Sequence, residues 1–280
     1  MIRLIRIGSI VLAFLIIFSV LFSSCSNSEP VETPMLSIEF SSTPPGNPFP
    51  YISGMNTGSS KRLEGKCLFV NIFFTDSDSY IRSSSGTWSI HLSEAFKFLT
   101  DSAAKYNREF LPIYNEPDIM LNYTVDFSIP DSFDDSAWEM EVFNRLYVQH
   151  DLDSILKNYD ADNVSYIYHI NKVGTSYALP GFSQNAPEIA VCYAWYNDDS
   201  IDLPMKPGMY AREVMHLYGA VPMYNLKDYR ASLAREFFSY DIMFDDPKLY
   251  DFEYFTAFDV TAYSVGWQDE LDEKYHLFIE

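Results

Sequence analysis

The chain has 280 residues, of which 48% are hydrophobic, and this is enough to bury a sizeable core in one large domain or two small ones. Its 39 acidic residues outnumber its 19 basic residues, which gives a formal net charge of −20. A surface of that sign repels nucleic-acid phosphates and lacks the basic face of a membrane-surface binder, so the charge argues against both classes.

The first 24 residues have the pattern of a secretory signal. Arg3 and Arg6 precede an almost wholly apolar run, residues 7–22, and the small residues Ser23 and Ser24 follow it. The run is shorter than the ~20 residues that a membrane-spanning helix needs. We therefore predict that residues 1–24 direct export of the chain.

Residues 21–25, Leu-Phe-Ser-Ser-Cys, resemble the lipobox of bacterial lipoproteins, in which the cysteine becomes the first mature residue and carries acyl groups. Phe22 departs from the leucine that is commonest there. The resemblance implies a lipid anchor on Cys25 in the bacterial cell envelope, in the outer membrane of a Gram-negative cell. An ordinary signal peptide and an uncleaved spanning helix are the alternatives. Residues 1–24 hold two basic and no acidic residues, so the remaining chain carries −22 and needs the lipid for anchoring.

Beyond Cys25, residues 25–60 are rich in Ser, Pro, Gly, Thr and Asn, which predicts a flexible tether. Apolar periodicity then predicts strands at residues 68–74, 120–127, 164–170, 174–180 and 188–195. Helices are expected at residues 89–106, at residues 138–158 with a break near residues 150–151, and at residues 209–218 after Pro207-Gly208, with Gly219 as the stop signal. This order predicts one mixed α/β domain over residues 61–280.

Two cysteines lie in this domain. Cys67 and Cys192 both fall in apolar segments that are predicted to be buried strands. Two buried free thiols are the simpler expectation, because a free cysteine packs as a small apolar residue. A disulfide between them stays open, because the envelope of a Gram-negative cell permits disulfides. Neither belongs to a CxxC pair, so the cysteines predict no metal site.

The segment with the clearest chemical pattern is residues 211–222, Ala-Arg-Glu-Val-Met-His-Leu-Tyr-Gly-Ala-Val-Pro. Two side chains four residues apart lie on one face of a helix, one turn apart, where a single zinc ion can take both. The segment resembles the HExxHxxGxxH or HExxHxxGxxD motif of metzincin-type zinc peptidases. It resembles more closely the HEVxHLxGAxD motif of certain bacterial lipoproteins.

This resemblance assigns a role to each matched position. Glu213 matches the general base, His216 matches the second zinc ligand, and Gly219 matches the sharp turn. Arg212 stands at the first ligand position and Pro222 at the third. An arginine stays protonated and offers no lone pair to a metal, and a proline side chain has no donor atom. The frame of the motif is therefore kept while two of its three ligands are lost.

Two further segments support the resemblance. Residues 240–243, Tyr-Asp-Ile-Met, resemble the Met-turn that runs beneath the metal site of this family, with Met243 as its methionine. Residues 260–271 resemble the family segment that follows, which often reads LTAYxIGWTDxL. The resemblance implies a zincin-like fold, in which a mixed sheet rests on the active-site helix and the C-terminal part is helical. The alternative is an accidental match in which His216 and Met243 are ordinary structural residues, as we interpret His169 to be.

Three functions are compatible with this sequence. The first is a pseudoenzyme that needs no cofactor and binds a peptide, a glycan or a partner protein in the former cleft, with Arg212 holding a carboxylate. The second is an active zinc metallopeptidase that draws its other ligands from elsewhere, for instance from His169. The third is a purely structural envelope lipoprotein. The loss of two of the three ligands favours the first.

Overall fold

The computed structural model describes residues 62–77, 87–134, 137–181, 187–198, 201–244 and 252–279. These ranges all belong to one compact unit, Thr43–Glu280. The predicted export signal, Cys25 and the predicted tether lie outside the described residues. Within them, no helix combines the length and the apolar character needed to cross a bilayer.

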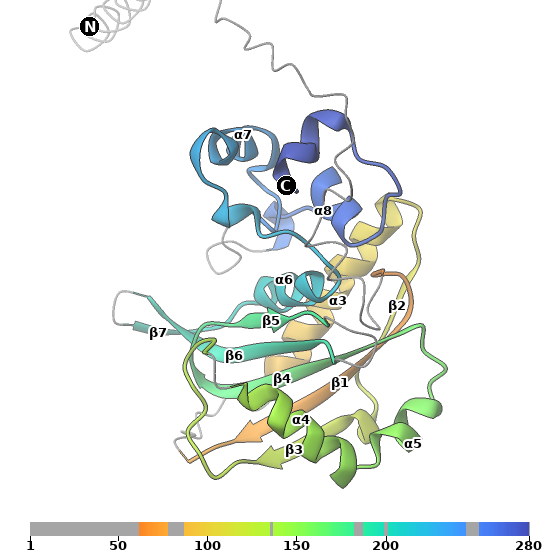
Figure 1. The fold of residues 1–280 in the computed structure, drawn as a ribbon, viewed down its shortest axis with the longest axis vertical. Coiled ribbons are helices and arrows are strands. Elements are labelled where there is room, and N and C mark those ends of the chain that lie inside the picture. Colours follow the sequence, from red (N-terminus) through yellow and green to blue (C-terminus); the bar gives the residue numbers. More distant parts are fainter. Residues whose placement is uncertain are drawn as a thin grey trace, which may run out of the picture. The chain divides into compact units, whose positions relative to one another are not determined.

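The centre of the described fold is a seven-stranded mixed sheet (Figure 1). Its main order is β2-β1-β4-β6-β5, with β3 pairing with β1 and β7 with β6. Strands β2, β3 and β4 run parallel to β1, β6 runs parallel to β4, and β5 and β7 run antiparallel to β6. The strands are β1 (Gly65–Thr75), β2 (Phe110–Ile113), β3 (Met120–Thr124), β4 (Asn163–Val173), β5 (Tyr177–Leu179), β6 (Ile189–Asp198) and β7 (Ile201–Pro204).

The central strands bury both of their faces, which explains why their sequences are nearly continuous apolar runs. Alternate side chains contribute to two different cores: Phe69 and Ile167 belong to one cluster, and Leu68 and Tyr168 belong to the other. Helices α3 (Thr87–Lys105) and α6 (Pro207–Leu217) cover the first face, and α4 (Trp138–Gln149) and α5 (Leu152–Lys157) cover the second (Figure 1).

The C-terminal part of the described chain is helical. It consists of η2 (Met223–Asn225), α7 (Asp228–Phe238), η3 (Phe252–Tyr254), α8 (Asp259–Ser264) and η4 (Glu273–Phe278). One more short helix, η1 (Pro117–Ile119), lies outside this part and precedes β3. Side chains from this part join the core cluster of α3 and α6, and Phe238, Trp267 and Phe278 are almost completely buried there. The predicted fold class, a mixed sheet resting on a helix with a helical C-terminal part, is confirmed.

Individual elements also follow the sequence pattern closely. The predicted helix at residues 138–158 is divided into α4 and α5, because Asp151 takes a left-handed backbone conformation with φ 46°. The edge strand expected at residues 174–180 is β5. Strand β2 was not predicted, because its sequence Phe-Leu-Pro-Ile contains Pro112, and a proline is tolerated only where its missing N–H is not needed, as at this sheet edge.

Both cysteines of the domain are buried free thiols. Cys67 lies on β1 and Cys192 on β6, and strand β4 lies between these two strands in the sheet. Neighbouring strands of a sheet are about 4.8 Å apart, so two strand spacings exceed the Cα separation that a disulfide allows. The simpler expectation of two free thiols is therefore confirmed.

Candidate functional site

Helix α6 presents the residues of the zinc-peptidase-like motif. Pro207 occupies its first turn, where its fixed φ suits a helix and its missing N–H is not required. The helix ends at Leu217, and Gly219 follows with φ 97°. Gly219 N donates to His216 O and Ala220 N donates to Met215 O, which is the Schellman arrangement that closes a helix. The predicted helix and its predicted stop are both confirmed.

Arg212 is held in the protein interior by contacts with Ile242 and Tyr224, which both lie outside its own helix. It is only 7% exposed. Its Nε donates to the backbone oxygen of Ile242 over 3.0 Å, and its guanidinium carbon lies 4.8 Å from the centre of the Tyr224 ring. The second contact is a cation–π geometry, which stabilises a buried positive charge. A fixed guanidinium therefore fills the position that the family resemblance gives to the first metal ligand.

The segment containing Met243 is tied to the segment at residues 260–271 through Asp241. The carboxylate accepts hydrogen bonds from Met243 N at 2.7 Å, Phe258 N at 2.7 Å and Thr261 Oγ1 at 2.8 Å. Asp241 and Met243 are both fully buried. Since Ile242 O accepts from Arg212, all three of the short motifs noted in the sequence meet around α6.

His216 has a defined tautomer. Its Nδ1 lies 2.9 Å from the backbone oxygen of Ala220, and a carbonyl can only accept, so Nδ1 carries the proton. Its Nε2 therefore has the lone pair and lies 3.5 Å from the Tyr224 hydroxyl. Burial lowers the pKa of His216 to about 4, and Arg212 adds to the lowering. A ring held by a carbonyl at one nitrogen is the usual orientation of a metal-ligating histidine, so His216 keeps that orientation.

Glu213 is 3% exposed and lies next to the same cluster. Burial raises the pKa of its carboxyl to about 7, although the positive charge of Arg212 lowers it. A carboxyl with such a pKa exchanges its proton near neutrality, as a general base or acid does. The position assigned to the general base therefore keeps a titratable group.

A cleft of about 750 Å³ opens beside α6. Arg212 and Glu213 line it from the helix, Tyr224 lines it from η2, and Arg235 lines it from α7. Thr175 and Ser176, just before the edge strand β5, line it from the sheet, and the remaining lining residues are Met209, Met223, Leu226, Ala231, Ser239 and Phe244. His216 does not line the cleft itself, but it contacts Tyr224, which does.

The donor groups at this site do not match those of a zinc centre. A catalytic zinc takes three protein ligands and a water, and here His216 supplies one imidazole while Arg212 and Pro222 supply no donor. Pro222 is the residue before η2, so the chain turns there and places Tyr224 over Arg212. Throughout the described ranges, no group of three or more His, Cys, Asp or Glu side chains could hold a metal ion.

His169 lies apart from this cleft. It contacts Asn71, Phe73, Trp88 and Tyr210, the last of which is in the first half of α6. It therefore does not complete a metal site with His216. Among the site residues, Tyr224 and Arg235 were not anticipated from the sequence, because nothing in their spacing relative to the motif marks them. Asp241 was also missed, but the sequence does contain a signal for it, because a carboxylate inside an apolar segment needs hydrogen-bond partners.

Comparison of the sequence with models of protein families finds no match. Comparison with curated proteins finds no similar protein either.

Proposed function

We propose that the protein is an envelope lipoprotein, anchored through Cys25, with a metallopeptidase-like domain that has lost zinc and catalysis. Its α6 cleft then acts as a binding site for a partner molecule. The proposal combines the lipobox resemblance with the contacts around α6, and it makes the protein a pseudoenzyme.

The observation that carries the proposal is the guanidinium of Arg212. Its hydrogen bond to Ile242 O and its packing on Tyr224 hold a positive charge one helical turn before His216. A divalent cation placed beside His216 would be repelled by that charge at short range. Loss of a ligand alone would weaken a zinc site, and a fixed cation in its place opposes zinc directly.

The charges of the cleft favour a ligand with a carboxylate. Arg212 and Arg235 both line it, in a chain whose acidic residues strongly outnumber its basic residues. Arginine forms paired hydrogen bonds with carboxylates, and Tyr224 offers an aromatic face and a hydroxyl at the same wall. A peptide with an acidic side chain or a free C-terminus suits this surface best among the expected ligand classes.

Zinc titration of repaired variants tests the loss of the metal. Arg212→His would place a second imidazole on the face of His216, and Pro222→Asp would add an oxygen donor after the Gly219 turn. We expect no stoichiometric zinc binding by the wild type, weak binding by Arg212→His, and the tightest binding by the double variant. Isothermal titration calorimetry on the full-length protein in detergent measures all three.

Arg235→His is the matched control for this experiment. It adds an imidazole to the same cleft from α7, where it has no partner one helical turn away. Stoichiometric zinc in the purified wild type, confirmed by elemental analysis, would favour the active metallopeptidase instead. A folded double variant that binds zinc no better than the wild type would mean that α6 is not a decayed zinc helix.

The anchor is tested separately. Cys25→Ser removes the thiol that acyl transfer requires, so the variant should lack acyl groups in mass spectrometry. It should also leave the membrane fraction or remain uncleaved. Cys67→Ser is the control, because Cys67 is a buried thiol of the folded domain. A Cys25→Ser protein that is still mature, acylated and membrane-bound would rule out the lipid anchor.

A further inference from the structure

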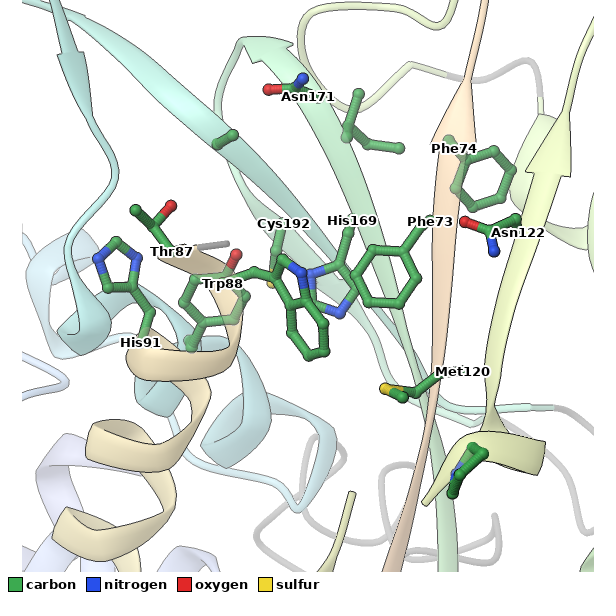
Figure 2. A pocket seen from close by; sticks show the side chains of 14 residues that line it. Phe73, Phe74, Thr87, Trp88, His91, Met120, Asn122, His169, Asn171 and Cys192 are labelled. Carbon is green, nitrogen blue, oxygen red and sulfur yellow. The ribbon is translucent and has the colours of Figure 1, made fainter. Parts of the chain in front are cut away.

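A second cavity, of about 470 Å³, lies on the α3 and α6 side of the sheet. It is formed near the C-terminal ends of the parallel strands β1 and β4, by the middle of β6, and by the N-terminal parts of α3 and α6 (Figure 2). Trp88 and His91 line it from α3, Tyr210 from α6 and His169 from β4. The other lining residues are Phe73, Phe74, Thr87, Pro117, Met120, Asn122, Ile170, Asn171, Cys192 and Ala194.

The hydrogen bonds of Asn71 fix the tautomer of His169. The side-chain nitrogen of Asn71 donates to Tyr114 O at 2.7 Å and to Phe69 O at 3.2 Å, so its other side-chain atom must be the oxygen. That oxygen lies 2.9 Å from Nε2 of His169. An amide oxygen only accepts, so Nε2 carries the proton and Nδ1 carries a lone pair.

This lone pair is buried without a donor. Nδ1 of His169 has no hydrogen-bond partner among the described residues, and the whole side chain is only 7% exposed. Protonation does not relieve the problem, because burial lowers the pKa of His169 to about 3. A buried acceptor without a partner costs about 1–3 kcal/mol, and a ligand that brings a donor removes that cost.

The walls of the cavity define the rest of the ligand. None of its described lining residues is Asp, Glu, Lys or Arg, in a chain with a formal charge of −20. A charged ligand would therefore be buried without a counter-charge. The ring of His169 is stacked on Phe73 at 4.5 Å, and Trp88 lies 5.6 Å from His169 (Figure 2). Such aromatic faces pack favourably against another planar ring.

We propose that this cavity binds a neutral, planar aromatic molecule with a hydroxyl group, which donates its hydrogen bond to Nδ1 of His169. The site is separate from the α6 cleft and needs neither metal nor catalysis. Nδ1 is covered in this structure, and the half-buried Trp88 ring packs against His169 in the first turn of α3. Binding therefore includes a side-chain movement that uncovers Nδ1, which lies among the rings of Phe73, Trp88 and Tyr210.

A pair of probes with one shape isolates the hydroxyl group. We would measure binding of 4-fluorophenol and 4-fluorotoluene to full-length protein in detergent by ¹⁹F NMR. The wild type should bind 4-fluorophenol more tightly than 4-fluorotoluene. His169→Phe keeps a ring but removes the lone pair, so the ratio of the two Kd values should fall by about tenfold. Partition of the probes into detergent is the same for both proteins and cancels from the comparison.

His150→Phe is the matched control. His150 also has a buried ring nitrogen, Nε2, without a partner among the described residues, but it lies at the end of α4, outside the cavity. The His150→Phe variant should therefore prefer 4-fluorophenol to 4-fluorotoluene as strongly as the wild type does. Ala194→Leu, which adds volume to the cavity wall, should weaken binding of both probes.

A measurement on the wild type keeps the proposal testable if His169→Phe does not fold. The ¹⁵N signal of Nδ1 should move upfield when 4-fluorophenol binds, and not when 4-fluorotoluene binds, because hydrogen bonding shields an acceptor nitrogen. The proposal is overturned if neither probe binds the wild type, if 4-fluorotoluene binds as tightly as 4-fluorophenol, or if His169→Phe keeps the wild-type preference.

Discussion

A histidine lines the His169 cavity and another, His216, lies beside the α6 cleft, but the charges around the two histidines differ. The cleft gathers Arg212 and Glu213 at its wall, with Asp241 close behind them. The cavity is lined by aromatic rings, amides and small side chains, without a charged residue among its described walls. The buried charges of α6, Arg212 and Glu213, thus lie in the middle of the helix and face the cleft, not the cavity.

The two imidazoles also differ in the ring nitrogen that donates a hydrogen bond. Beside the cleft, His216 donates from Nδ1, and its Nε2 faces the hydroxyl of Tyr224, whose ring packs on Arg212. In the cavity, His169 donates from Nε2 and leaves Nδ1 as an acceptor. The properties of the cleft should therefore depend on pH and charge, while those of the cavity should depend on shape and on one hydrogen bond.

The largest expected effect comes from Glu213. Burial raises its pKa from the reference value of 4.5 to about 7. Between these values the native state keeps a proton that the unfolded state has released, so the free energy of unfolding falls as pH rises through this window. Glu213→Gln removes this loss and should be more stable than the wild type by about 3 kcal/mol at pH 8. The two proteins should be nearly equal at pH 4.

Urea unfolding of the wild type and Glu213→Gln at pH 4, 6 and 8 measures this difference. Glu109→Gln, at an exposed position, is the control and should follow the wild type at every pH. Parallel stability curves for Glu213→Gln and the wild type would show that Glu213 is not held protonated by burial, and the contrast between the cleft and the cavity would lose its main support.

The next effect concerns Asp241, which joins the Met243 segment to the segment after it. Asp241→Asn replaces one acceptor oxygen by an amino group that faces a donor, so at least one of three hydrogen bonds is lost. A buried donor without a partner should reduce the free energy of unfolding by about 2 kcal/mol. Asp126→Asn, on the exposed surface, should change it by less than about 0.5 kcal/mol.

Urea unfolding at pH 4 measures this second change. Burial raises the pKa of Asp241 to about 7, so at higher pH the variant would also lack the destabilisation that a buried carboxyl brings. Asp241→Asn should also loosen Ile242, whose carbonyl accepts from Arg212, so the Arg212 Nε–H signal should shift in NMR spectra. A stability equal to that of the wild type would mean that this carboxylate does not organise the floor of the cleft.

Much of the fold and part of the cleft could be predicted from the sequence, because the signals are local. Pro207 and Gly219 mark the start and the end of α6, and their effects come from the backbone of those residues alone. The four-residue spacing of Arg212 and His216 likewise places both on one helical face. Local signals do not depend on how distant parts of the chain meet.

The other features of the two sites depend on contacts between distant parts of the chain, and these contacts could not be predicted. Tyr224 matters because η2 carries its ring over Arg212, and no spacing in the sequence encodes that contact. His169 was interpreted as a structural strand residue, and its bond to Asn71 and its stacking on Phe73 agree with that interpretation. Its unpartnered Nδ1 could not be foreseen, because it depends on contacts with residues far away in the sequence, such as Asn71, which is 98 residues from His169.

The last prediction concerns the tautomers of the two histidines. It involves the smallest free energies, but it tests most directly whether the cleft and the cavity differ. Burial lowers the pKa of His216 to about 4 and that of His169 to about 3, so both rings should stay neutral down to about pH 5. Long-range ¹H–¹⁵N NMR spectra should show the proton on Nδ1 in His216 and on Nε2 in His169. His216→Gln and His169→Gln assign the two sets of signals.

Arg212→Met then separates the two regions. Removing the guanidinium should raise the pKa of His216, because Arg212 lowers it, and should leave His169 unchanged, because its lowered pKa comes from burial alone. Both histidines lose a proton on folding at acid pH, so each contributes stability that is present above pH 6.5 and is lost as pH falls towards its native pKa. If His216 titrates near 6.5 in the wild type, or if both rings carry the proton on the same nitrogen, the cleft and the cavity do not differ in the way that their hydrogen bonds indicate.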